Sequence, residues 1–202
     1  FETWGCLMGE AHRISRGFIT SGRPTWSDQI RSMKDLIPFS EESAHRELRA
    51  VEVLLAELPV DTDGFGLIHF DFDNIHWKGD TITGVFDFDD CAFYWFEADI
   101  ASALDGLFDR RMDGVNLQDE RLTAFLTGYR SRKPIGEEAI QRIPLFVRFC
   151  HLLTFSRIIW SLGEGPQGDE PQWTTDLRQK FTAALDSHRE TFQDSPVSAF
   201  IG

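Results

Sequence analysis

The chain has 202 residues, of which 42% are hydrophobic and 26% are charged. This composition excludes disordered and collagen-like proteins and is sufficient for one substantial core. With 20 basic and 33 acidic residues the net charge is −13, which repels phosphate backbones, so we expect no nucleic-acid partner. The same charge would attract a cationic small molecule directly, whereas an anionic one would need a metal ion or a local basic patch.

The sequence also argues against a membrane protein and against a disulfide framework. No stretch approaches the roughly 18 uninterrupted apolar residues of a membrane helix, so we expect no membrane contact. The first residue is Phe1, and the residues after it lack the basic start and apolar run of a signal peptide, so we expect the chain to start within a longer protein. Cys6, Cys91 and Cys150 are far apart and form no CxxC pair, which favours a reducing, cytoplasmic compartment.

The first third of the chain is expected to be helical. Apolar residues recur at intervals of three and four over residues 1–18, which predicts an amphipathic helix. After a loop, a second helix is expected to begin with Ser40 as its cap, because a serine hydroxyl satisfies free N–H groups at a helix start. Its apolar stripe ends at Leu58, and Pro59 stops it.

The middle of the chain has a different pattern. Short strand-like runs are expected over residues 66–69, 75–77 and 81–86, and Lys78-Gly79-Asp80 provides a turn between the last two. This pattern predicts a small hairpin region embedded in helices.

The remainder is again expected to be helical. Helices are predicted over residues 100–108, 117–129 and 173–192, and a glycine-rich loop over 163–168. The segment 137–162 is apolar on more than one side and has Pro144 near its start, which predicts a central helix packed by several others. No composition shift marks a second domain, so residues 1–202 are expected to form one unit.

The densest chemical signal is a set of aspartates at the ends of the predicted strands. Its members are Asp71, Asp73, Asp87, Asp89 and Asp90. Like charges that a fold brings together raise one another's pKa unless a cation neutralises them, so a divalent metal is the simplest explanation. Apolar neighbours such as Phe72 and Phe86 indicate that the group is partly buried. All-oxygen ligands favour magnesium, calcium or manganese over zinc; for any single aspartate, a solvated turn is the alternative.

Three motifs occur in an order that resembles one enzyme family. They are Gly66-Leu67-Ile68-His69-Phe70-Asp71-Phe72-Asp73-Asn74, then Ile82-Thr83-Gly84-Val85-Phe86-Asp87-Phe88-Asp89-Asp90, then Ala98-Asp99-Ile100-Ala101. This order resembles the aminoglycoside phosphotransferase and choline kinase-like family, whose members share the protein-kinase-like fold. The segment from Trp4 to Arg13 resembles the helix that the family places ahead of its catalytic loop. The resemblance implies an α+β fold: a mostly helical C-terminal lobe with a small β-hairpin region.

Roles follow from the positions that match the family's motifs. The resemblance implies that Asp71 is the catalytic aspartate, which orients the substrate hydroxyl and accepts its proton. It implies that Asn74 and Asp87 hold magnesium (Mg) against the phosphates of ATP or GTP. For Asp89 and Asp90 three roles remain open: a water-mediated metal contact, attraction of a cationic substrate, or a structural role. Phosphoryl transfer requires such a set because it depends mostly on positioning and charge neutralisation. For Asp99 we expect a structural role that braces the catalytic loop.

The chain departs from the family pattern in two places. The family's loop reads H-x-D-x-x-x-x-N, whereas Asn74 follows Asp71 by three positions rather than five. Three residues span about 10 Å at full extension, so both side chains could still reach one ion. We expect His69 to pack beneath this loop and to satisfy backbone carbonyls there. The second departure is the absence, before Phe1, of the nucleotide-covering sheet with its phosphate-gripping lysine, so this chain alone is expected to bind nucleotide poorly.

The sequence therefore predicts a magnesium- and ATP-dependent phosphotransferase that acts on a small-molecule hydroxyl, with aminoglycosides, amino alcohols such as choline, sugars and amino acids such as homoserine as acceptor classes. Two alternatives remain. The run from Val85 to Asp90 resembles the first motif of haloacid-dehalogenase-like phosphatases, with Asp87 as the residue phosphorylated, but that motif opens a parallel sheet and helices follow it here. The other alternative is a non-catalytic binding module that keeps the lobe.

Overall fold

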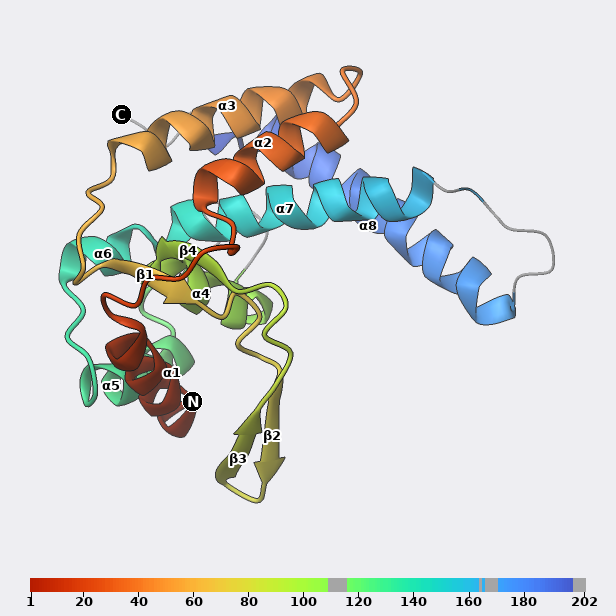
Figure 1. Ribbon diagram of the computed structural model, residues 1–202. Coiled ribbons are helices and arrows are strands. Elements are labelled where there is room, and N and C mark those ends of the chain that lie inside the picture. The colour runs from red at the N-terminus through yellow and green to blue at the C-terminus, as the bar shows by residue number, and fades with distance from the viewer. Residues whose placement is uncertain (109–115, 164, 166–170, 198–202) are drawn as a thin grey trace.

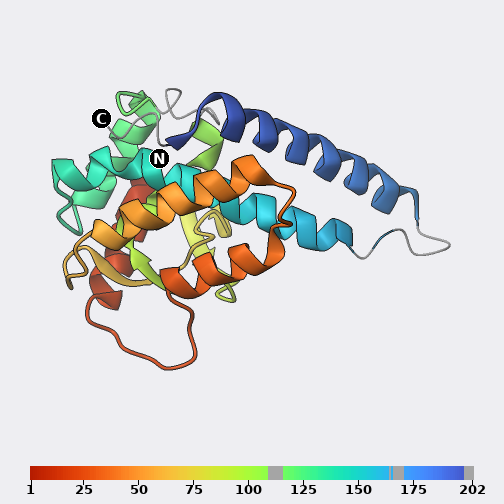
Figure 2. The same cartoon turned by 90° about the horizontal axis from the view of Figure 1, so that it is seen from above.

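The computed structural model describes residues 1–202 except 109–115, 164, 166–170 and 198–202. A long helix, α7 (Ile143–Gly163), packs against α2 (Trp26–Leu36), α3 (Glu42–Glu57), α4 (Phe96–Ala103) and α8 (Gln172–Asp194) (Figure 1). This confirms the central helix that the apolar sequence predicts. The far ends of α7 and α8 extend beyond the other helices, as Figure 2 shows from above.

The expected helix over 137–162 is interrupted. The chain forms α6 (Glu137–Gln141) and then α7, which meet at Arg142. Pro144 explains the break, because proline lacks an amide N–H and is tolerated only in the first turn of a helix. By length and composition the stretch Glu137–Gly163 could cross a membrane, but 61% of its most apolar window is buried inside the protein. A core helix has the same properties, so this stretch is weak evidence for a membrane span.

The first helix, α1 (Glu2–Ser15), packs on α5 (Glu120–Arg130) closely enough to require glycine. A Cβ atom on Gly128 would lie 1.9 Å from the Glu2 carbonyl oxygen. The prediction that the first helix reaches residue 18 is wrong, because Gly17 takes a left-handed φ of 70° just beyond Ser15.

Helix α2 was missed by the sequence analysis. It begins with a capping box, in which the Thr25 hydroxyl accepts the Asp28 N–H and the Asp28 carboxylate accepts the Thr25 N–H at 2.9 Å. The prediction that Ser40 caps the next helix is wrong, because α3 begins at Glu42, with Glu41 as N-cap and no side-chain cap bond. Thr25-x-x-Asp28 is the sequence signal that could have revealed α2.

The strands form two small antiparallel sheets. Strand β1 (Phe65–Ile68) pairs with β4 (Ala92–Trp95), and β2 (Ile75–Lys78) pairs with β3 (Thr81–Val85) in a hairpin whose turn contains Gly79 at φ 60°. The three expected strands are confirmed to within one residue at each end, and β4 was missed. This topology joins the β1–β4 sheet to the hairpin through two loops, and those loops carry the aspartates.

Other expectations are corrected in the C-terminal half. The helix predicted over 100–108 begins earlier, as α4 at Phe96, and continues in the short 3-10 helix η1 (Asp105–Leu107). Most of the glycine-rich loop at 163–168 lies outside the described residues. Trp160 and Trp173 are 61% and 66% exposed, because both lie where α7 and α8 extend beyond the other helices.

A buried ion pair anchors the end of the chain. Arg148 of α7 contacts Glu47 of α3, and both side chains are fully buried. The Glu47 carboxylate also accepts the Val197 N–H at 2.9 Å, and Arg148 donates to the carbonyl of Ser195. These contacts connect α3, α7 and the segment after α8 through charged groups that have no access to water.

Candidate active site

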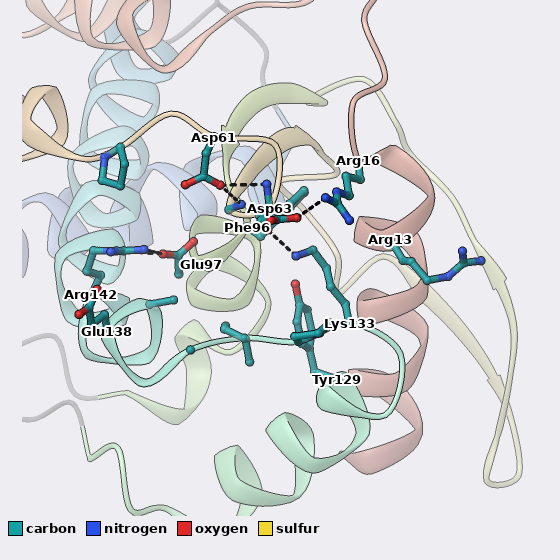
Figure 3. Close-up of a pocket in the computed structure, with 16 residues that line it drawn as sticks. Arg13, Arg16, Asp61, Asp63, Phe96, Glu97, Tyr129, Lys133, Glu138 and Arg142 are labelled. Atoms are coloured by element: carbon teal, nitrogen blue, oxygen red, sulfur yellow. Dashed lines mark hydrogen bonds and ion pairs between the residues drawn. The ribbon is translucent and has the colours of Figure 1, made fainter.

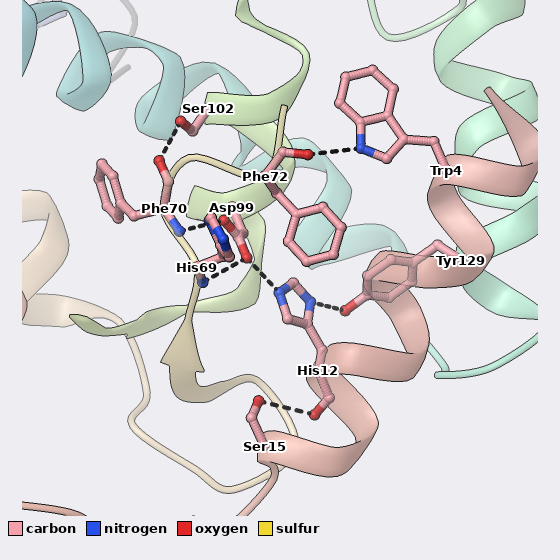
Figure 4. A network of polar contacts seen from close by, with 9 residues as sticks. All are labelled: Trp4, His12, Ser15, His69, Phe70, Phe72, Asp99, Ser102 and Tyr129. Carbon is pink, nitrogen blue, oxygen red and sulfur yellow. Dashed lines mark hydrogen bonds and ion pairs between the residues drawn. The ribbon is translucent and has the colours of Figure 1, made fainter. Parts of the chain in front are cut away.

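The Asp71 loop, residues 69–74, follows β1 and is fixed by a buried carboxylate. Asp99 of α4 accepts the backbone N–H of His69 at 3.0 Å and that of Phe70 at 2.7 Å (Figure 4). The hydroxyl of Ser102 donates to the Phe70 carbonyl at 2.7 Å. Phe70 has a φ of 71°, a left-handed conformation that is strained for an aromatic residue. The expected bracing role of Asp99 is therefore confirmed.

Two residues that the sequence analysis did not single out continue this network. Asp99 contacts Nε2 of His12 at 2.9 Å, and Nδ1 of His12 contacts the Tyr129 hydroxyl at 2.8 Å (Figure 4). Burial lowers the pKa of His12, and its hydrogen bond with Asp99 opposes that effect. A neutral His12 that donates from Nε2 to the carboxylate must accept at Nδ1, so the Tyr129 hydroxyl donates. Neither residue lies in the three motifs, and only the fold brings them to Asp99.

The shortened loop still brings its two polar residues together. The Asn74 side-chain amide donates to the Asp71 carboxylate at 2.6 Å, and the Asn74 backbone N–H donates to the Asp71 carbonyl at 3.1 Å. The indole N–H of Trp4 binds the Phe72 carbonyl at 2.9 Å, so α1 holds the loop from its other side. Because Asn74 uses its amide nitrogen toward Asp71, its amide oxygen stays available as an acceptor.

The Asp71 carboxyl group is electrostatically unusual. Its pKa is raised from 3.8 to about 6. The main cause is partial burial, and the hydrogen bond with Asp73 and the negative charge of Asp73 add to it, whereas the hydrogen bond from the Asn74 amide lowers the pKa. A nearby cation would reverse this rise, because it favours the ionised form. Within the described part of the chain, the charged neighbours that act on Asp71 are therefore the carboxylates Asp73 and Asp90.

The second aspartate-bearing loop, residues 86–91, connects β3 to β4 and is called here the Asp87 segment. His69 of the Asp71 loop is buried and its Nε2 contacts the Phe86 carbonyl at 3.1 Å, which confirms the expected packing of His69. The Phe88 ring lies 4.5 Å from the His69 ring. Asp87 has a left-handed φ of 64° and is exposed. These contacts hold the two loops next to each other.

The expectation that all five aspartates are partly buried is wrong. Asp71 and Asp90 are half-buried, whereas Asp73, Asp87 and Asp89 are exposed. The reason is that the Asp87 segment lies at the protein surface, where even its Phe86 and Phe88 side chains are half exposed.

The Asp87 segment is also held by cations from outside it. Both carboxylate oxygens of Asp90 accept from Arg157 of α7 at 2.9 Å. Arg23 donates to the Asp89 carbonyl at 2.9 Å. Arg157 neutralises Asp90, so Asp90 does not offer a free charge to a cationic substrate.

The two loops offer a carboxylate and an amide oxygen that could bind a hard divalent cation. Within the described ranges, no three or more His, Cys, Asp or Glu side chains gather closely enough to hold a metal ion. Magnesium does not need such a group, since it is usually bound by one or two carboxylates together with water and substrate phosphates. Asp87 supplies an exposed carboxylate and Asn74 a free amide oxygen, both of the oxygen type that magnesium prefers.

The cysteines show no sign of reactivity. Cys91 and Cys150 are buried, and burial raises the pKa of both thiols. Cys6 is partly exposed, and no disulfide forms among the three.

Known proteins with a similar sequence are phosphotransferases. The model of a family described as the phosphotransferase enzyme family matches residues 2–135. Amicoumacin kinase of Bacillus subtilis (strain 168) is 25% identical over 166 residues, which cover 77% of this chain and 49% of that protein. The chain thus spans about half the length of this curated relative.

Solved structures show the same fold. An amicoumacin kinase in complex with AMP-PNP, Ca²⁺ and Ami superposes with a TM-score of 0.74 at 22% identity, covering 97% of this chain and 59% of that one. A microcompartment-associated aminopropanol kinase gives 0.61 at 24% identity, with coverages of 95% and 59%. A choline/ethanolamine kinase family protein from Mesorhizobium loti gives 0.58 at 15% identity, with coverages of 95% and 66%. The fold is thus that of kinase-like phosphotransferases, and the chain belongs to the phosphotransferase enzyme family.

Proposed function

We propose that the chain is the catalytic lobe of a magnesium- and ATP-dependent kinase that transfers a phosphoryl group to a hydroxyl of a small molecule. The observation that carries the proposal is the contact of Asp71 with Asn74 at 2.6 Å on a loop that Asp99 fixes through two backbone N–H groups. Phosphoryl transfer depends on such positioning more than on covalent chemistry of the protein.

Each polar residue then has a distinct role. Asp71 accepts the proton of the acceptor hydroxyl and orients its oxygen, while the Asn74 amide holds the Asp71 carboxylate in place. Asp87 and the Asn74 amide oxygen are the residues that would hold the metal ion, with Asp89 contributing through water. Magnesium held by these residues would supply neutralisation of phosphate charge. The similar amicoumacin kinase structure contains AMP-PNP and Ca²⁺, which supports a nucleotide with a divalent cation here; the choice between ATP and GTP is left to the assay.

The walls beside the Asp71 loop suit a nucleotide base. A cavity of about 300 Å³ is lined by Phe1, Trp4, Asp73, Ile75 and Trp77. Aromatic and aliphatic side chains of this kind stack well on planar rings. Asp73 connects the cavity to the loop that carries Asp71, so a base bound there would have its phosphates near the proposed metal residues.

We propose an acceptor with a positive charge. The chain has a net charge of −13, and Asp73, Asp87 and Asp89 are exposed around the site, which favours cations over anions. Among the similar proteins, an aminopropanol kinase carries the name of an amino alcohol. Amino alcohols and aminoglycosides, which combine an ammonium group with a hydroxyl, are therefore the first acceptors to test.

The test is ATP-dependent phosphorylation by the protein expressed from its complete gene. Phosphorus NMR follows a panel of amino alcohols, aminoglycosides, sugars and hydroxy amino acids with magnesium present. We expect Asp71→Asn to reduce turnover by at least about 100-fold, a typical contribution of general-base catalysis. Asp80→Asn makes the same change in the exposed hairpin turn and should leave turnover unchanged.

Two results would favour the alternatives. Nucleotide binding without transfer to any acceptor, in wild type and variants alike, would indicate a non-catalytic binding module. A phosphorylated Asp87 would indicate a phosphatase of the haloacid-dehalogenase type, but the sheets of the described residues are two-stranded and antiparallel, unlike the parallel sheet that such enzymes need. The free cysteines agree with the cytoplasmic location that we propose.

A further inference from the structure

A large cavity beside α1 offers no net charge to a ligand. It has a volume of about 600 Å³ and lies between the end of α1, the segment before β1, the start of α4 and the turn from α5 to α6 (Figure 3). Four basic and four acidic side chains line it. Arg16 pairs with Asp63 at 2.6 Å, Arg142 pairs with Glu97 at 2.5 Å, and Lys133 donates to the Asp63 carbonyl. The charges of this cavity therefore select neither an anion nor a cation.

A smaller cavity, also beside α1, has a mostly apolar wall. It has a volume of about 290 Å³ and lies between α1, β1, the Asp71 loop and the Asp87 segment. This volume is at the lower end of the range of sites for small organic ligands, about 300–1,000 Å³. Apolar side chains that line it include Leu7, Ala11, Leu67, Phe72 and Phe88. None of the proposed catalytic and metal-binding residues lines it, so a ligand bound there would not occupy the proposed active site.

The charged groups in the wall of this smaller cavity are already paired. Among the described residues, no lysine or arginine lines it. The Asp99 carboxylate already accepts the three N–H groups of the network in Figure 4. Glu10 forms an ion pair with Arg13 at 2.6 Å. A charged ligand would find no free counter-charge here, and a buried charge without a partner is unfavourable, so this wall suits an uncharged ligand.

One polar atom in this wall has no partner. His69 lines the cavity and is only 4% exposed, and its Nδ1 finds no hydrogen-bond partner among the described residues. Its Nε2 contacts the Phe86 carbonyl at 3.1 Å, so Nε2 carries the proton and Nδ1 of the neutral imidazole is an acceptor. A buried acceptor without a donor is unfavourable. A ligand with an O–H group would supply the missing donor.

The rings beside His69 indicate the shape of the ligand. The centres of the Phe72 and Phe88 rings lie 5.4 and 4.5 Å from the centre of the imidazole, and both rings meet it edge to face. Aromatic rings pack favourably on one another in this way. Phe88 is 52% exposed, and exposed side chains change rotamer within nanoseconds, which gives a ligand access to Nδ1. A flat aromatic body would also cover the exposed part of the Phe88 ring.

We propose that the smaller cavity binds an uncharged aromatic alcohol of the phenol type, whose hydroxyl donates to Nδ1 of His69 while its ring packs against Leu7 and Phe88. Such a ligand would contact α1, the Asp71 loop and the Asp87 segment together, because all three line the cavity. It would therefore stabilise the position of the Asp87 segment beside the Asp71 loop.

Fluorine NMR with 4-fluorophenol as the probe tests the proposal on the protein expressed from its complete gene. We expect binding to the wild type with a dissociation constant of about 1 mM, and binding of 4-fluoroanisole about 10-fold weaker, because the anisole has the same ring but no O–H group. His69→Gln keeps an N–H group for the Phe86 carbonyl but removes the acceptor at Nδ1. It should weaken 4-fluorophenol binding by about 10-fold and leave 4-fluoroanisole binding unchanged. His76→Gln, at an exposed histidine of the hairpin, is the matched control and should bind both probes like the wild type.

A second variant tests the location of the site without changing His69. Ala11→Phe fills the cavity from α1 and should abolish binding of both probes, whereas Ala183→Phe adds the same ring at an exposed position of α8 and should leave binding unchanged. Circular dichroism and the unfolding temperature show which variants are folded. If His69→Gln does not fold, the comparison of phenol with anisole on the wild type still tests the hydrogen bond.

Three results would overturn the proposal. They are no binding of 4-fluorophenol to the wild type at about 10 mM probe, equal binding of 4-fluorophenol and 4-fluoroanisole, and binding that persists in a folded Ala11→Phe. In each of these cases the cavity is only a gap in the packing of α1 against the two loops.

Discussion

Replacing Asp99 by Asn tests how much the Asp71 loop depends on one buried carboxylate. Asp99 is fully buried and accepts three N–H groups: those of His69 at 3.0 Å and Phe70 at 2.7 Å, and Nε2 of His12 at 2.9 Å. An amide of the same shape has one oxygen instead of two, and its NH₂ group would face a donor. At least one donor therefore loses its acceptor, and the others lose a charged partner. Hydrogen bonds to charged groups contribute about 1.5–3 kcal/mol each, so we expect the free energy of unfolding to fall by about 3 kcal/mol.

Urea denaturation followed by tryptophan fluorescence measures this change. Asp105→Asn is the matched control, because Asp105 also accepts from a histidine, His151 at 3.1 Å, but its side chain is 52% exposed. We expect that control to lose less than about 1 kcal/mol. A loss of less than about 1 kcal/mol for Asp99→Asn, or equal losses for both variants, would refute the view that Asp99 determines the loop's conformation.

Three further predictions concern the site, the helix contact and the missed helix. The pKa of Asp71 in the folded protein, about 6, exceeds its ordinary value of 3.8. In metal-free buffer the free energy of unfolding of the wild type should therefore fall relative to that of Asp71→Asn as the pH rises from about 4 to 6. Urea denaturation of both proteins at several pH values measures this difference, and parallel pH profiles would contradict the prediction. Gly128→Ala, whose Cβ would lie 1.9 Å from a backbone oxygen, should destabilise by at least about 2 kcal/mol in the same assay, whereas Gly84→Ala, with nothing within 4 Å of its Cβ, should change stability by less than about 1 kcal/mol. Thr25→Ala should lose about 1 kcal/mol through its cap, and Ser40→Ala should lose nothing measurable, as thermal unfolding of the pair can show.

The hairpin region was predictable because its signals are local. Alternating strand-forming residues over 75–77 and 81–86 and the turn at Lys78-Gly79-Asp80 specify a hairpin from neighbouring residues alone, and the structure places β2 and β3 there. Strand β4 was missed since Ala92–Trp95 is uniformly apolar, and a short apolar run does not reveal its partner. Its pairing with β1 bridges more than twenty residues of sequence, which no local pattern encodes.

For the site, the motifs identified the residues but not their surroundings. The spacing of Asp71 and Asn74 indicated that both could reach one ion, and the structure shows them in direct contact in spite of the shorter loop. The burial of the aspartates was misjudged, because the apolar neighbours Phe86 and Phe88 turned out to be half exposed. A sequence pattern shows which positions are apolar, but the exposure of a side chain depends on which other elements pack against it.

The sequence by itself determined the family, the order of the loops that carry Asp71 and Asp87, and most of the helices, because motif order and periodicity are properties of neighbouring residues. Only the tertiary structure determined that His12 and Tyr129 support Asp99, that Arg157 neutralises Asp90, and that Lys133 is buried against the Asp63 carbonyl and the Phe96 ring. These partners are separated by tens of residues in the chain. Charge pairing and burial arise from distances in space, and the packing of the helices sets those distances.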